Sequence, residues 1–216
     1  MKHLVLAMIV GVLVGCSKEQ TEESVFDQGR PDVTKPSKPP VKTEVQIEAA
    51  NKTFAEIKTM AEAGDADAQL VLGLMYSIGE GVEQDLKEAV KWLQKAADQR
   101  NAKAQYMLGN MYNKGEGVPQ DFKEAVKLYR KAAEKGGAFA QYNLGIGYAK
   151  GQGVLLDYVA AYTWANIAIA NGIDVKKFKV NKFKELLEKK MTPEQIAKAQ
   201  ELSKEMVKKN PKLINK

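Results

Sequence analysis

The sequence has almost none of the residue types on which many catalytic and metal sites depend. Its 216 residues include one histidine and one cysteine, and both His3 and Cys16 lie near the N-terminus. A single cysteine cannot form a disulfide bond within the chain. Histidine-based triads, general bases and metal ligands are excluded from every position after His3. We therefore predict no metal, no cofactor and no enzymatic activity.

Long hydrophobic runs are also missing. Residues 4–14 are apolar or glycine, about half of the roughly 20 residues that a membrane-spanning helix needs. Lys2 precedes this stretch and the small Gly15 follows it. A positive charge, a short apolar core and a small residue are typical of a secretory signal peptide. We predict a signal peptide over residues 1–15.

The positive charge is concentrated at one end of the chain. The formal net charge is +6, and residues 175–216 contain 13 lysines against 5 glutamates. The remainder is nearly neutral, so the composition does not indicate a nucleic-acid-binding protein. Lysines on an amphipathic helix usually form a solvated face, and contact with acidic lipid headgroups is the alternative reading.

Residues 17–43 have the composition of a disordered tether. Four prolines, Pro31, Pro36, Pro39 and Pro40, alternate with small and charged residues, and large apolar side chains are nearly absent. Such a segment cannot bury enough apolar surface to fold. A coil of this length spans roughly 30 Å on average, enough to hold a folded domain away from a surface.

Residues 13–16, Leu-Val-Gly-Cys, resemble the bacterial lipobox, in which the cysteine becomes the lipid-modified first residue of the mature protein. The resemblance implies that Cys16 is lipidated and that residues 16–43 tether the protein to a membrane. Ser17 in place of an aspartate favours the outer membrane, with the protein facing the periplasm; the inner membrane and the cell surface are alternatives. A coincidental cysteine in an ordinary signal sequence is the other reading.

An internal repeat of 36 residues dominates the rest of the sequence. Residues 66–101 and 102–137 agree at about 21 of 36 positions, and residues 138–173 form a third unit in the same register. A fixed period of this length is the signature of a repeat architecture. The positions that share this register include Gly73, Gly109 and Gly145, and also Asp85, Asp121 and Asp157.

Each unit reads as two helices. In unit two, small and apolar residues at helical spacing predict a first helix, helix A, that stops at Gly115 and Gly117. Asp121 and Glu124 then predict the N-cap and capping-box partner of a second helix, helix B, which ends near Gly136. Two helices cannot bury their own apolar faces, so stacked units are expected.

The pattern Ala-x-Ala-Gln-x-x-Leu-Gly-x-Met-Tyr-x-x-Gly-Glu-Gly-Val, followed by Gln-Asp-x-Lys-Glu-Ala-Val-Lys and Lys-Ala-Ala, resembles the Sel1-like repeat, a relative of the tetratricopeptide repeat. The resemblance implies an all-α, right-handed solenoid of helix-turn-helix repeats. Residues 44–65 then form an N-terminal capping half-repeat and residues 174–216 a C-terminal helical cap with a basic tail. Unit three departs from the pattern at Gly147, Leu156, Val159 and Ala160.

Two further features belong to the helices. Thr192, Pro193 and Gln195 predict a helix start in the cap, with apolar residues from Ile196 to Met206 on one face. Trp92 and Trp164 occupy the helix B position that Leu128 fills in unit two. Core packing is therefore preferred over ligand stacking for both tryptophans.

The positions that vary between units fall on one stripe of helix A, at steps of three and four residues. In the resembled families helix A lines the concave surface, which implies that this stripe contacts a partner. Aromatic and amide side chains suit a groove for a protein or peptide. Packing between repeats is the alternative for the tyrosines. The predicted contact residues are Lys103, Tyr106, Asn110, Asn113, Phe139, Tyr142 and Asn143.

These observations predict a monomeric, non-enzymatic interaction scaffold that binds an envelope protein or peptide and reaches the membrane through Cys16. An immunity lipoprotein that neutralises a periplasm-delivered toxin, such as a phospholipase, is a narrower alternative. An envelope glycan-active enzyme with paired carboxylates is an alternative of another class. Its candidates, Glu80 and Glu116, recur at equivalent turn positions, which favours a structural role. The Ser-x-x-Lys and Lys-Thr-Gly signatures of penicillin-binding enzymes do not occur.

Overall fold

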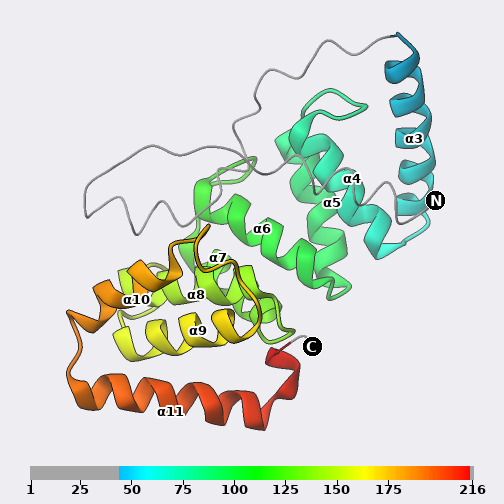
Figure 1. Cartoon of the computed structure of the whole chain (residues 1–216). Helices are drawn as coiled ribbons and strands as arrows, with labels where there is room; N and C mark the ends of the chain where they lie inside the picture. The colour runs from blue at the N-terminus through cyan, green and yellow to red at the C-terminus, as the bar shows by residue number, and fades with distance from the viewer. Residues whose placement is uncertain (1–43, 215–216) are drawn as a thin grey trace.

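The computed structural model describes residues 44–214, with side chains from Thr53 onward, and every regular element in this part of the chain is helical (Figure 1). The predicted signal peptide, Cys16 and the tether lie outside the described residues. Within that range no helix has the length and hydropathy needed to span a bilayer. The elements are α3 (Glu44–Glu62), α4 (Ala66–Ile78), α5 (Leu86–Asp98), α6 (Ala102–Lys114), α7 (Phe122–Ala133), α8 (Ala138–Lys150), α9 (Tyr158–Ala170), α10 (Val180–Glu188), α11 (Pro193–Lys209) and the 3-10 turn η1 (Pro211–Leu213).

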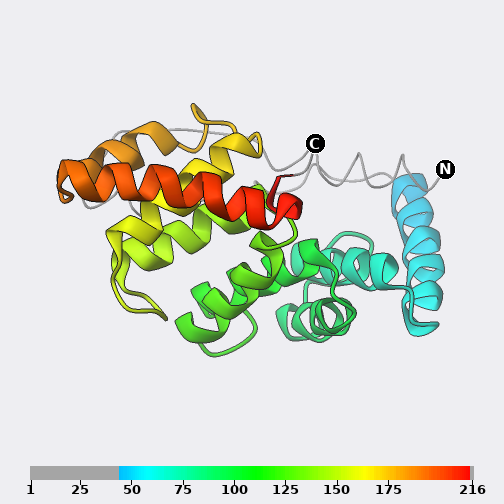
Figure 2. The same ribbon diagram turned by 90° about the horizontal axis from the view of Figure 1, so that it is seen from below.

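Three helix pairs form the body of the protein. The pairs α4–α5, α6–α7 and α8–α9 correspond to helices A and B of the three units, and each pair packs on the next through α5–α6 and α7–α8. Helix α3 packs on α4 at one end, and α10 and α11 cover the other. Figure 2 shows the stacked pairs as a curved array. The predicted all-helical solenoid is confirmed.

The turn between helices A and B needs both of its glycines. In unit two Gly115 ends α6 in a left-handed conformation, with φ of 75°, and its amide donates to the Met111 carbonyl. The second glycine, Gly117, lies against the preceding pair: a Cβ added there would be 2.3 Å from the Leu86 carbonyl oxygen. Gly153 in unit three lies in the same way against Phe122, so the turns of units two and three are wedged against the start of helix B in the unit before. Only glycine permits this approach.

Helix B begins as predicted, with one correction. The Asp121 carboxylate accepts hydrogen bonds from the amides of Lys123 and Glu124. Glu124 does not complete a capping box, because the Asp121 amide already donates to the Tyr112 carbonyl at 2.9 Å. The Glu124 carboxylate instead pairs with Lys127, one turn further along, at 3.0 Å.

A buried glutamine joins each pair to its neighbour. The Gln105 side-chain amide donates to the Ala97 carbonyl at 3.1 Å, and its oxygen accepts from Lys135 at 3.2 Å. Burial, followed by the nearby Arg100 and Lys131 charges, lowers the pKa of Lys135. The equivalent bonds are made by Gln69 with Ala61 and Gln99, and by Gln141 with Ala133 and Asn171. The shared glutamine of the sequence pattern is therefore an inter-repeat clamp.

The C-terminal cap is a modified fourth helix pair. Helices α10 and α11 both pack on α9 and lie on either side of it (Figure 1). The Tyr142 hydroxyl donates to the Phe178 carbonyl at 3.0 Å, and the Thr163 hydroxyl donates to the Ala199 carbonyl at 3.3 Å. Both pairs of residues are separated by 36 positions. The repeat register thus continues into the cap.

The end of the chain folds back onto the repeats. Thr192 and Gln195 form the predicted capping box at the start of α11. Beyond α11, the Asn210 side chain donates to the Glu134 carbonyl at 3.4 Å, and the Leu213 carbonyl accepts from Gln141 at 2.7 Å. The tail therefore fastens the cap to the junction between the second and third pairs.

The core follows the repeat. Alanines and leucines of facing helices fill it, and both tryptophans, Trp92 and Trp164, are buried among them. This confirms core packing over ligand stacking. Small residues at the contacts allow close approach of the helices: a Cβ on Gly109 would lie 2.8 Å from the Tyr129 ring.

Candidate partner-binding surface

Three aromatic side chains form a continuous row across two repeats and the cap. Tyr106 belongs to α6, Phe139 to the first turn of α8, and Phe178 to the turn before α10. The Phe139 ring centroid lies 6.0 Å from that of Tyr106 and 5.0 Å from that of Phe178. We call these three residues the aromatic row. Ring pairs at such separations are worth about 0.5–1.5 kcal/mol each beyond their buried area.

Phe139 is the exposed member of the aromatic row. Its side chain is 45% exposed, whereas Phe178 is buried and Tyr106 is half-buried. Phe139 therefore presents a ring face or edge to solvent while its neighbours hold it in place. A large apolar side chain that is both exposed and supported is typical of an interaction site.

A fixed amide network lies beside the row. The Asn110 side-chain oxygen accepts hydrogen bonds from the Tyr129 hydroxyl at 2.8 Å and from the Asn143 amide at 3.1 Å. The Tyr129 ring also contacts Tyr106, with centroids 6.2 Å apart. These bonds join α6, α7 and α8 beneath the row. The bond between Asn143 and Asn110 thus connects the two repeats next to this surface.

The structure separates the predicted contact residues into two groups. Lys103, Tyr106, Asn110 and Phe139 are exposed or half-buried, so their contact with a partner remains a prediction. Asn113, Tyr142 and Asn143 are buried.

Tyr142 is corrected to a packing residue. Its side chain is 2% exposed, and its ring packs edge-on against Phe183, with centroids 5.5 Å apart. Burial raises the pKa of its hydroxyl, which donates to the Phe178 carbonyl. The cap covers the helix A stripe of unit three, including Ile146 and Ala149. A chain without the cap would expose these positions.

Phe178 is a member of the row that sequence reasoning missed. It lies in the segment Lys-Lys-Phe-Lys, whose lysines alone predict a solvated face. The signal that could have found it is the repeat itself, because Phe178 follows Tyr142 by 36 residues, just as Tyr142 follows Tyr106.

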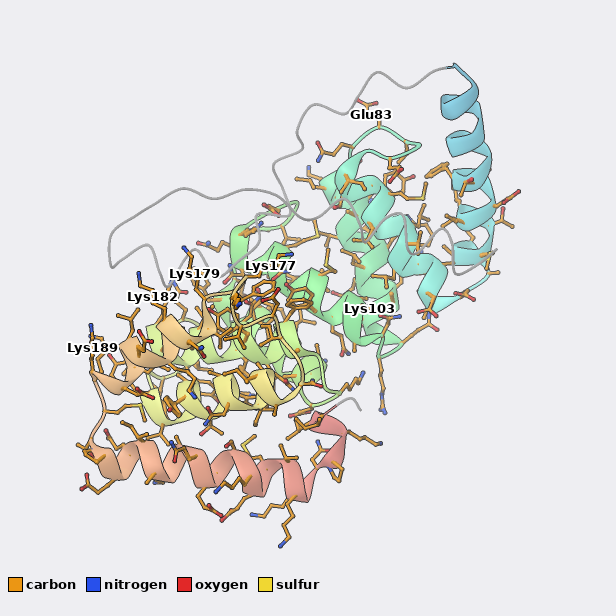
Figure 3. The ribbon with its side chains drawn as sticks, in the orientation of Figure 1. Glu83, Lys103, Lys177, Lys179, Lys182 and Lys189 are labelled. Atoms are coloured by element: carbon orange, nitrogen blue, oxygen red, sulfur yellow. The ribbon has the colours of Figure 1, made fainter. Side chains whose placement is uncertain are left out.

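Lysines lie near the row. Figure 3 labels Lys103 at the start of α6 and Lys177 in the turn before α10. The Lys177 ammonium lies 5.7 Å from the centroid of the Phe178 ring, close enough for a cation–π contact. The surface thus combines aromatic area with positive charge.

The described residues contain no group of three or more histidine, cysteine, aspartate or glutamate side chains that could hold a metal ion. The turn glutamate Glu116 forms an ion pair with Lys114 at 3.5 Å, in agreement with a structural role.

Comparison with known proteins identifies the repeat. Residues 66–101, 102–137 and 138–173 each match the family model of the Sel1 repeat. A Sel1 repeat protein from Oxalobacter formigenes is 38% identical, with 62% of this chain and 98% of that chain covered and a TM-score of 0.55. Protein c5321 of uropathogenic Escherichia coli, described as a protective antigen with an SLR fold, is 27% identical, with a TM-score of 0.55.

The alignment with the Escherichia coli protein covers 89% of this chain but 47% of that one, so the chain spans about half of its length. A search of curated proteins gave no match. The family matches together cover half of the chain, in the same helix pairs that the structure shows. The chain belongs to the Sel1 repeat family, whose members are protein-interaction scaffolds.

Proposed function

We propose that this protein is a non-enzymatic scaffold, attached by a lipid to the bacterial cell envelope, that binds a protein partner on the aromatic row. The observation that carries the binding site is Phe139, an exposed ring held between Tyr106 and Phe178. Aromatic anchors of this kind dominate protein interfaces, because they bury a large area with little loss of side-chain entropy.

The neighbouring polar groups give this site its expected specificity. The Asn110 side-chain NH2 group can donate a hydrogen bond to a peptide carbonyl. Lys103 lies one helical turn from Tyr106. A partner segment with an apolar side chain for Phe139 and an acidic side chain for Lys103 would complement both features.

The lipid anchor is proposed from the sequence. Residues 13–16 resemble a lipobox, residues 1–15 resemble a signal peptide, and the proline-rich segment that follows has the composition of a tether. Acyl chains contribute about 0.8 kcal/mol per buried methylene, so a multiply acylated cysteine would hold the protein stably on a membrane. This arrangement would keep the aromatic row within reach of envelope partners.

Capture from detergent-solubilised membranes tests the binding site. The bait is the full chain with a C-terminal tag, and the test variant carries Tyr106→Ala and Phe139→Ala. The control variant carries Leu155→Ala and Leu156→Ala, because these two residues are also large, apolar and exposed but lie in the turn between α8 and α9.

We expect a partner that the wild-type chain and the control variant both retain and that the test variant loses. With the purified partner, loss of the two rings should raise Kd at least 30-fold, as expected for an interface hot spot of about 2 kcal/mol or more. Both variants should keep the helical circular dichroism spectrum. Equal retention by the test variant would reject the aromatic row as the binding site.

The anchor is tested separately. In the encoding bacterium, the Cys16→Ser variant should move from the membrane fraction to the soluble fraction and should no longer incorporate labelled fatty acid. If the wild-type protein incorporates no fatty acid, the lipid anchor is wrong, whatever the outcome of the capture experiment.

A further inference from the structure

The cap carries a dense group of lysines on one edge of the molecule. Residues 174–190 contain seven lysines and three acidic residues. Figure 3 shows Lys177, Lys179, Lys182 and Lys189 along α10 and the turn before it, on the side away from α11. All four side chains are exposed. We call these four residues the lysine row.

Three members of the lysine row are not neutralised within the described part of the chain. Lys177, Lys182 and Lys189 form no ion pair with any residue that the structure describes. Lys184 differs, because it is half-buried over the Tyr162 ring, at 4.6 Å from its centroid. The row therefore projects positive charge into solvent.

Three acidic side chains lie nearby, and one of them, Glu188, is directed away from the row. The Glu188 carboxylate accepts from the Tyr162 hydroxyl at 2.6 Å, on the α9 side of α10. The Asp174 carboxylate accepts from the backbone amides of Lys176 and Lys177 at 3.0 and 2.9 Å. Glu185 is the exposed acid on α10 itself. The two exposed carboxylates, Asp174 and Glu185, do not balance the charge of the four lysines.

We propose that the lysine row docks on the surface of a membrane that contains anionic phospholipids. The row follows the outer edge of a helix, and a line of long cationic side chains on such an edge can reach phosphate groups across a plane. Each lysine close to an anionic bilayer contributes about 1 kcal/mol, which is about fivefold in partitioning. The contributions add along the row.

The proposed lipid anchor would make this weak attraction effective. A tether of the length of residues 17–43 keeps the domain within roughly 30 Å of the surface on average, which raises the local concentration of headgroups around the cap. Docking of the lysine row depends on the proposed lipid anchor only for bringing the cap close to the membrane. The attraction itself can be measured on a chain that carries no acyl group.

A substitution at Lys179 can remove a positive charge without destabilising the fold. Lys179 is the N-cap of α10 and has a left-handed conformation, with φ of 50°. A side chain with a Cβ is strained in this conformation, whereas glycine adopts it readily. Lys179→Gly should therefore preserve the fold while removing one charge from the row.

Co-sedimentation with vesicles tests the proposal. The protein is residues 17–216, which contain all of the described helices, and the vesicles are either phosphatidylcholine alone or an equal mixture with phosphatidylglycerol. The test variant replaces Lys177, Lys182 and Lys189 by glutamine. The matched control replaces Lys87, Lys123 and Lys131, which are exposed lysines on the repeats, and loses the same net charge.

The wild-type chain and the control should bind the anionic vesicles, with little binding to phosphatidylcholine and a strong decrease at high salt. The test variant should lose about 100-fold in partitioning, and Lys179→Gly about fivefold without loss of thermal stability.

Equal binding to both vesicle types would overturn the proposal, and so would an equal loss in the control variant. Binding to soluble poly-glutamate without binding to vesicles would also overturn it, because the row would then be a site for an acidic protein segment. The vesicles contain no protein partner and the chain no acyl group. A negative result here therefore leaves the proposed scaffold function standing.

Discussion

The inter-repeat glutamine clamp gives the sharpest stability prediction, at Gln141. This side chain is 0% exposed and bonds to three groups: the Ala133 and Leu213 carbonyls at 3.1 and 2.7 Å and the Asn171 amide at 3.3 Å. Gln141→Met keeps the length and approximate volume of the side chain and removes all of these bonds.

The expected cost comes mainly from one carbonyl. The Ala133 carbonyl keeps the amide of Gly136 as a donor at 3.0 Å, whereas the Leu213 carbonyl has no second donor among the described residues. A buried acceptor without a partner costs about 1–3 kcal/mol. We therefore expect about 2 kcal/mol of destabilisation. For a domain of this size, that lowers Tm by roughly 4–8 °C.

Urea unfolding followed by circular dichroism measures the change, and hydrogen exchange locates it. Protection should fall most in α8, α9 and the tail that Leu213 anchors, because neighbouring repeats unfold in partly independent steps. Gln94→Met is the control, since Gln94 bonds only to Asp98 on the surface of its own helix and should change stability by less than about 0.5 kcal/mol. If Gln141→Met matches this control, the clamp is wrong.

Three further predictions follow from single contacts. Gly153→Ala places a Cβ 2.1 Å from a carbonyl oxygen of α7 and should cost more than about 2 kcal/mol in urea unfolding, whereas Gly172→Ala, also at positive φ but with open space around it, should cost about 1 kcal/mol. Asp121→Ala removes an N-cap that accepts two amide hydrogen bonds and should lower stability by about 1 kcal/mol, with a larger loss of exchange protection in α7 than in α5. Burial, together with a hydrogen bond to an α10 carboxylate, raises the pKa of Tyr162 to about 12, so the folded chain keeps a proton that the unfolded chain loses near pH 10. The free energy of unfolding should therefore fall as pH rises from 10 to 12, and it should fall less steeply in Tyr162→Phe. Parallel curves of unfolding free energy against pH for the two proteins would contradict this prediction.

Much of the fold was predictable because its sequence signals are local and repeated. Gly115 and Asp121 mark the end of helix A and the start of helix B within a few residues, and the same marks recur at a constant offset. The capping-box partner was predicted wrongly at Glu124, because the competing hydrogen bond of the Asp121 amide comes from the preceding helix. The local sequence pattern does not predict hydrogen bonds between neighbouring helices.

The binding surface was predictable only in part for the same reason. Helical spacing placed Tyr106 and Tyr142 on one stripe, but it could not show that the cap would cover Tyr142 while leaving Phe139 exposed. The sequence predicted a C-terminal cap, but it did not predict which residues the cap would cover. Its first helix starts late, after the left-handed residue Lys179, so the register was hidden by a change in element length.

Site-specific photo-crosslinking tests whether a partner binds on the aromatic row. A photoreactive phenylalanine analogue at position 139 replaces a ring that is already exposed, and the same analogue at position 155 serves as the control, since Leu155 is 90% exposed on a turn. In cells that make the full chain, we expect a discrete crosslinked partner at position 139 and none at position 155. Crosslinking at position 155 alone, or no crosslink at position 139, would contradict it.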